Sequence, residues 1–180
     1  MTLQTESWIA PVAAADTEWD TGTPLDRCED LATVMHERLR THLPRIGLLL
    51  YRVAEGDAGT HPELPRLLEL FSQLSGEVKL HLAHEETLLL PWLHDRVEVP
   101  LASDEAMEML LPLEVEQQNA RRLLAQIRAM THDYSPPADA CAAYRSVLRA
   151  LEHLEREVAD LIGFEDNILY PRILNRPSNF

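Results

Sequence analysis

The sequence predicts an all-α protein folded as an up-down-up-down four-helix bundle. The chain of 180 residues contains only six glycines and few β-branched residues, a composition that favours helices over sheets. Four long segments carry apolar residues at alternating spacings of three and four, which is typical of a helix with one buried face. Short polar connections join these segments, and short connections favour antiparallel neighbours.

The predicted helices cover about residues 24–54, 61–95, 103–132 and 136–170. Thr23 and Pro24 provide a cap and a first-turn proline for the first helix. Ser103 is an N-cap for the third, with acidic residues in its first turn. Pro44 and Pro112 fall inside helices and are expected to kink them, and Pro171 is expected to kink or end the fourth helix.

The chain divides into a short tail and one domain. Residues 1–23 contain four acidic residues and no Lys or Arg, so we interpret them as a mobile acidic tail. Whether Trp8 and Trp19 dock on the domain is left open. Residues 24–175 form the helical bundle. The N-terminus has neither the basic start nor the apolar stretch of a signal peptide, so we expect a cytoplasmic protein.

The charge and composition exclude several classes of partner. The formal net charge of −14 makes nucleic acid or an anionic membrane an unsuitable partner, because either requires a basic face. No run of about 18 apolar residues exists that would span a membrane. Cys28 and Cys141 are too few for a disulfide framework.

Polar residues interrupt the apolar row of every predicted helix. They are His36, His81, Glu85, Gln117 and Glu165. At a rise of about 1.5 Å per residue, His36 and His81 reach nearly the same height in the bundle, and the other three lie within about two turns of that level. We therefore expect one buried polar patch, which is the strongest functional signal in the chain.

The sequence also contains an imperfect repeat. VKLHLAHEETLLLPWL at residues 78–93 aligns with VADLIGFEDNILYPRIL at 158–174, so that Glu85 matches Glu165 and Pro91 matches Pro171. His81 is matched by Leu161. The chain thus reads as two related helical hairpins, of which the second keeps the carboxylate and lacks the imidazole.

Five stretches together carry a family resemblance: MHERLRTHLP, HPEL, HLAHEETLLLP, IRAMTHDYSPPADAC and FEDNILYPR. Over about residues 24–175 the chain resembles the hemerythrin-like (HHE cation-binding) proteins. Within that family it is most similar to the C-terminal domain of the di-iron proteins that repair iron centres. The resemblance implies a hemerythrin-like bundle and a role in iron, oxygen or nitric-oxide stress chemistry.

The resemblance also implies a ligand set. In that family, four His and two bridging Glu hold two irons. His36 and His81 fall on ligand His positions, and Glu85 and Glu165 fall on the bridging carboxylates. Gln117 and Leu161 stand where the family has its other two His, so two of six ligands are replaced. A further family His falls on Asp57, which we exclude because about 31 Å of helix separates it from His36.

Two interpretations of the polar patch remain open. In the first, His36, His81, Glu85 and Glu165 bind one divalent ion, with Gln117 as a weak ligand or a donor to a ligand. One iron is favoured over two, and Mn(II) or Zn(II) also suits these donors. The protein would then sense, store or donate a metal or bind a small diatomic ligand, rather than act as a turnover enzyme. In the second, the bundle binds no metal, and its histidines and carboxylates bond to one another in a module that binds a protein partner.

The other histidines have simpler interpretations. His84 lies one turn from His81 but off the apolar row; we expect it to be exposed, with a contact behind the ligands as the alternative. His42 has no ligand partner at a convincing spacing. His153 and Glu157 are four residues apart and are expected to form a surface pair. Tyr170, beside Pro171, is expected to pack rather than to bind a ligand.

Overall fold

The computed structural model describes residues 24–94 and 103–174, and these form four helical columns. The first column is α1 (Pro24–Asp57). The second comprises α2 (Leu64–His84), the π-helical turn η1 (Glu85–Leu89) and α3 (Leu90–His94). The third is α4 (Ser103–Met130), and the fourth comprises α5 (Ala142–Phe164), the π-helical turn η2 (Glu165–Leu169) and α6 (Tyr170–Leu174). The predicted tail at residues 1–23 lies outside the described residues.

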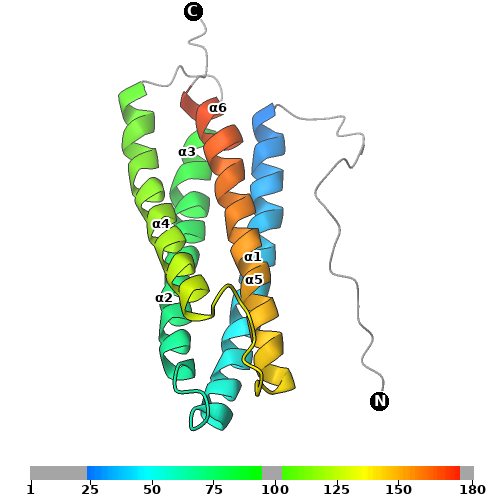
Figure 1. The fold of residues 1–180 in the computed structure, drawn as a ribbon. Coiled ribbons are helices and arrows are strands. Elements are labelled where there is room, and N and C mark those ends of the chain that lie inside the picture. Colours follow the sequence, from blue (N-terminus) through cyan, green and yellow to red (C-terminus); the bar gives the residue numbers. More distant parts are fainter. Residues whose placement is uncertain (1–23, 95–102, 175–180) are drawn as a thin grey trace, which may run out of the picture.

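Successive columns run in opposite directions, so the predicted up-down-up-down bundle is confirmed (Figure 1). The main contacts join α1 to α2, α1 to α5, and α2 to α4. None of the described helices is long and apolar enough to cross a membrane.

The apolar core is divided into two clusters by a polar layer. On α1, Ala32 belongs to one cluster and Leu39 to the other, with His36 between them. On α4, Leu113 and Ala120 flank Gln117 in the same way. Leu82 and Leu89 flank Glu85, and Ile162 and Leu169 flank Glu165. Every column therefore contributes at least one polar residue to this layer, and the second contributes both His81 and Glu85, as the interrupted rows predicted.

The two π-helical turns correct the predicted ends of the second and fourth apolar rows. Continued at α-helical spacing, these rows place Leu88 and Ile168 on the buried face after Glu85 and Glu165, yet both are exposed. Leu89 and Leu169 are buried instead. A π-helical turn has more residues per turn than an α-helix, so each turn moves the buried face on by one residue.

The same turns explain why the helices continue past their prolines. The amide of Tyr170 donates to the carbonyl of Glu165, five residues earlier, and Leu90 donates likewise to Glu85. A proline at the next position lacks an amide and crowds the preceding turn, and the wider turn makes room for its ring. Pro171 therefore does not end the helix, which runs to Leu174.

The loop between α4 and α5 is longer than predicted. α4 ends at Met130, because His132, Asp133 and Tyr134 adopt positive φ angles that are incompatible with a right-handed helix. α5 begins at Ala142 rather than near Pro136, and Cys141 caps it by accepting a hydrogen bond from the amide of Tyr144.

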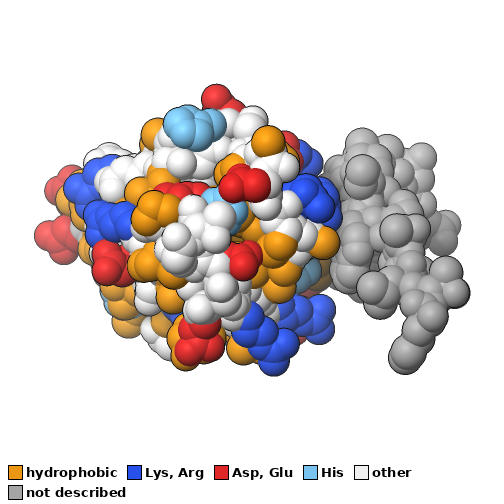
Figure 2. Space-filling model, turned by 60° about the horizontal axis from the view of Figure 1, so that its bottom comes forward, with side chains coloured by type: hydrophobic (Ala, Val, Ile, Leu, Met, Phe, Trp, Pro, Cys, Tyr) orange, Lys and Arg blue, Asp and Glu red, His pale blue; other side chains and the backbone are white. Residues whose placement is uncertain are grey.

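The surface of the bundle carries charges of both signs. Figure 2 shows Lys and Arg side chains alternating with acidic and apolar side chains on the face brought forward there. That face presents no continuous basic area.

Candidate metal centre

The polar layer is buried at the middle of the bundle. His36 and Glu165 have no exposed surface, and Glu85 and Gln117 are almost as fully buried. Each comes from a different column, so the layer joins all four. Both glutamates are the first residues of the π-helical turns. The sequence repeat thus corresponds to a structural repeat that places two carboxylates side by side.

His36 is held between two carboxylates. Its Nε2 lies 2.9 Å from Oε2 of Glu85, and its Nδ1 lies 2.9 Å from Oε1 of Glu86. Glu86 is held in turn by Arg40, whose Nη2 lies 2.5 Å from Oε2 of Glu86. The ring therefore has one nitrogen toward the core carboxylates and the other fixed by an outer carboxylate.

His81 is arranged in the same manner. Its Nε2 lies 3.1 Å from Oε2 of Glu165, and its Nδ1 lies 3.3 Å from Oε2 of Glu116. The second oxygen of Glu116 lies 2.6 Å from Nδ1 of His84. Each imidazole of the layer is thus backed by a carboxylate, and each of those carboxylates is itself held by a basic side chain.

One group in the layer has the spacing of metal ligands. His36, Glu85 and Glu165 each place one ligand atom within 4.8 Å of the other two. Gln117 donates from Nε2 to Oε2 of Glu165 at 2.5 Å, and the hydroxyl of Tyr170 donates to Oε1 of Glu85 at 3.3 Å. Gln117 and Tyr170 therefore orient the two carboxylates.

In the metal-free layer, burial and neighbouring charges together raise the pKa values of both imidazoles and of Glu165. Burial disfavours the charged form of His81, but the hydrogen bond and charge of Glu165, with the charges of Glu85 and Glu116, outweigh it and raise its pKa to about 9. Burial likewise opposes protonation of His36, and its bonds to Glu85 and Glu86 raise its pKa nonetheless. Burial and the charge of Glu85 raise the pKa of Glu165.

The donor set suits a cation. Two buried carboxylates repel each other and need a positive charge between or beside them. Oε1 of Glu165 is buried and has no hydrogen-bond partner, and Nδ1 of His81 lacks a bond of good geometry. Imidazole nitrogen and carboxylate oxygen are ligands of Fe(II), Mn(II) and Zn(II). An imidazole whose second nitrogen faces a carboxylate is the usual arrangement around such ions.

Leu161 occupies the position that the repeat assigns to an imidazole. It is buried in the apolar cluster. With His81, Glu116 and Gln117 it lines a cavity of about 10 Å³, room for about one water molecule. This side of the layer therefore offers fewer ligands than the side near His36.

The structure brings together the five residues singled out from the sequence and adds three. Glu86, Glu116 and Tyr170 all contact the layer, although none belongs to an apolar row. The Glu85-Glu86 pair and the Glu116-Gln117 pair are the only sequence signals that point to the first two. Tyr170 was expected only to pack, and its hydroxyl bonds to Glu85.

Three expectations for other residues change. His84 is about one-third exposed and bonds to Glu116, which contacts His81, so the alternative of a contact behind the ligands describes it better than simple exposure. Glu157 is buried rather than on the surface, and His42 lies against it. The additional contact with Glu157 is made by His42 of α1. A residue pattern within α5 alone cannot reveal a contact from another helix. Asp57 lies beside Cys141, away from the layer.

A groove near the layer includes His84 in its lining. It has a volume of about 500 Å³, runs between α3 and α4 and is lined mostly by apolar side chains with His84 at one end. His84 bonds to Glu116, and Glu116 contacts His81. A small molecule that touches His84 in the groove is therefore linked to His81 through two side chains, those of His84 and Glu116.

The pKa of His81 predicts how the stability of the metal-free protein changes with pH. Its pKa of about 9 in the folded protein exceeds the ordinary histidine value of 6.5. Protonation of His81 then adds on the order of 3 kcal/mol to the free energy of unfolding. This contribution is fully present below about pH 6.5 and is lost as the pH rises through about 9. We expect urea unfolding with a chelator present to show this loss, and His81→Gln to reduce it. An equal loss in wild type and His81→Gln would contradict the assignment.

Comparison with known proteins identifies the family of the chain. The profile of the hemerythrin HHE cation binding domain matches residues 30–173. The chain is also similar to the iron-sulfur cluster repair protein YtfE of Escherichia coli O139:H28 (strain E24377A / ETEC), of Escherichia coli strain K12 / DH10B and of Shigella boydii serotype 18. Each is 26% identical over 158 residues, which is 87% of this chain and 69% of the relative. The chain belongs to the hemerythrin HHE cation-binding domain family.

Proposed function

We propose that this chain is a metal-binding protein that holds one divalent ion, preferentially iron, in the polar layer of the bundle. His36, Glu85 and Glu165 are the proposed ligands, and His81, whose Nε2 contacts Glu165, completes the set. Gln117 is proposed to orient Glu165 from outside the ligand set. Two carboxylates and two neutral imidazoles carry a charge of about −2, which one divalent ion neutralises.

The observation that carries this proposal is the orientation of the two imidazoles. Both direct Nε2 toward a buried carboxylate, and both direct Nδ1 toward an outer one, Glu86 or Glu116. For His36 this contact is a hydrogen bond, which fixes the ring and raises its basicity as a ligand, whereas Glu116 places a negative charge 3.3 Å behind the His81 ring without a hydrogen bond. A polar core built only for packing has no need of a second carboxylate behind each ring.

We further propose an iron-linked role, in the repair of iron centres or in the handling or sensing of oxygen or nitric-oxide stress. The support is the family membership and the similarity to proteins named for iron-sulfur cluster repair. A bound iron supplies redox chemistry and an affinity for small diatomic molecules. The groove that reaches His84 is the proposed approach for such a molecule.

A second candidate, a metal-free bundle that binds a protein partner, is favoured by one observation. Leu161 fills an imidazole position with an aliphatic side chain, and the remaining histidines are already bonded to carboxylates. In this alternative, protonated His36 and His81 replace the cation.

Removal of metal distinguishes the two candidates. If the free ion is present at about a hundred times its Kd, binding raises the free energy of unfolding by roughly 3 kcal/mol. For a domain of this size that corresponds to an increase of about 5–10 °C in Tm. We expect a chelator to lower the Tm of the anaerobically purified protein by this amount and added Fe(II) to restore it. An unchanged Tm in both conditions would favour the metal-free bundle.

A further inference from the structure

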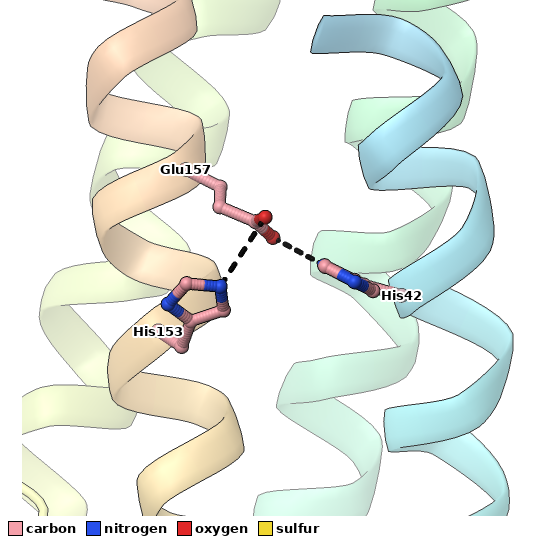
Figure 3. A group of neighbouring side chains, drawn as sticks. All are labelled: His42, His153 and Glu157. Carbon is pink, nitrogen blue, oxygen red and sulfur yellow. Dashed lines mark hydrogen bonds and ion pairs between the residues drawn. The ribbon is translucent and has the colours of Figure 1, made fainter. Parts of the chain in front are cut away.

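A second group of potential ligands lies outside the polar layer, where α1 faces α5. Figure 3 shows His42 of α1 directed toward Glu157 of α5, with His153 one turn away from Glu157 on the same helix. Nδ1 of His42 lies 2.8 Å from Oε2 of Glu157, and Nε2 of His153 lies 3.4 Å from Oε1. The three residues each offer one ligand atom within 4.8 Å of the others.

Glu157 is the buried member of this group. Its side chain is 5% exposed, whereas the side chains of His42 and His153 are 20% and 43% exposed. Oε1 of Glu157 is buried and accepts no hydrogen bond. A buried carboxylate oxygen without a bonding partner is costly, and here it is directed toward two imidazoles at the protein surface.

This group is separate from the polar layer. His42 follows His36 by six residues, about 9 Å along α1, and Glu157 precedes Glu165 by eight, about 12 Å along α5. Leu39 and Leu161, both in the apolar core, lie between the two levels along the chain. One ion cannot contact both groups.

We propose that His42, His153 and Glu157 form a second, solvent-facing site for a divalent first-row metal ion, of the Zn(II) or Fe(II) class. Two imidazoles and one carboxylate are a common ligand set for these ions and leave coordination positions for water. The ligands arise from one i,i+4 pair on α5 and one residue on α1, so the packing of two rigid helices holds them in place. The site does not depend on occupancy of the polar layer.

Arg38 competes for the same carboxylate. Its Nε lies 3.9 Å from Oε1 of Glu157, and its side chain is 44% exposed. An exposed arginine at that distance contributes little stability and can turn toward solvent. It holds positive charge near Glu157 when no ion is bound and opposes a cation there. Removing this charge should therefore strengthen metal binding.

The test is a calorimetric titration of the metal-free full-length protein with Zn(II). We expect His153→Asn to weaken one class of binding site by at least about ten-fold. Arg38→Gln should strengthen the same class. Glu152→Gln, which removes a neighbouring acid bonded to Arg156, is the matched control and should leave it unchanged. The His153 side chain is 43% exposed and lies outside the apolar core clusters, so its replacement should not prevent folding.

Two further measurements separate this site from the polar layer. Glu85→Gln should retain the binding that His153→Asn removes, and ring-nitrogen NMR signals of His42 and His153 should shift on addition of Zn(II). Identical isotherms for wild type and His153→Asn would overturn the proposal. So would a wild-type protein whose entire Zn(II) binding is lost in Glu85→Gln.

Discussion

Replacing Glu85 by glutamine is expected to lower the iron content of anaerobically purified protein by about one ion per chain, the ion held in the polar layer. Glu85 is 1% exposed and lies in the group of three potential ligands with His36 and Glu165. Glutamine keeps the shape of the side chain, so it can still bond to His36 and Tyr170. It removes one negative charge and one anionic ligand, which the remaining residues of the layer cannot supply.

Mass spectrometry of the metal content, with protein concentration measured in parallel, checks this result. Glu69→Gln is a suitable control, because Glu69 is an exposed acid on α2 that bonds only to Arg66 among the contacts described for it. It should retain the wild-type metal content. With a chelator present, the Tm of Glu85→Gln should lie close to that of wild type, since the loss arises from the missing ion. Equal metal content in both proteins would refute the proposed ligand role of Glu85.

Restoring two imidazoles is expected to raise the number of ions held in the polar layer from about one toward two per chain. The change is Gln117→His combined with Leu161→His. Leu161 aligns with His81 in the repeat, and it lines the same small cavity as His81, Glu116 and Gln117. Histidine is close to leucine in size, so it fits there without a large void. The side of the layer that now offers few ligands would then match the side near His36.

This double variant also has a predictable effect on stability. Without metal, a buried imidazole at position 161 has no hydrogen-bond partner. This should lower the free energy of unfolding by about 1–3 kcal/mol. The Tm should therefore fall further in chelator than it does for wild type, and added Fe(II) should reverse the difference. Leu161→Gln is the control: it places a polar side chain at the same buried position without adding an imidazole that could bind the metal. A metal content that stays near one would show that the position of the helices, not the missing imidazoles, limits the second ion.

The polar layer could be predicted because it depends on helical periodicity. His36, Gln117 and Glu165 each interrupt an apolar row, and a helix of fixed rise and turn places them on the buried face at a calculable height. The same argument located Glu85 and His81. Glu86 and Glu116 escaped it, since both lie one position off a row and reach the layer only through the length and direction of their side chains.

The π-helical turns mark where periodicity fails. An α-helical row predicts Leu88 and Ile168 inside, whereas the inserted residue in each turn places Leu89 and Leu169 there. The prolines at positions 91 and 171 indicate that regular α-helical hydrogen bonding is interrupted near them. They did not reveal that the helix would widen rather than end, because that outcome depends on the packing of α3 and α6 against the bundle.

The sequence by itself determined the four helices, their antiparallel order and the presence of two carboxylates and two imidazoles in the core. These follow from local spacing, which a helix converts directly into position. Only the tertiary structure decided which imidazole meets which carboxylate, and that His42 meets Glu157 across 115 residues. Such contacts depend on the rotation and separation of neighbouring helices, and no pattern within a single helix encodes them.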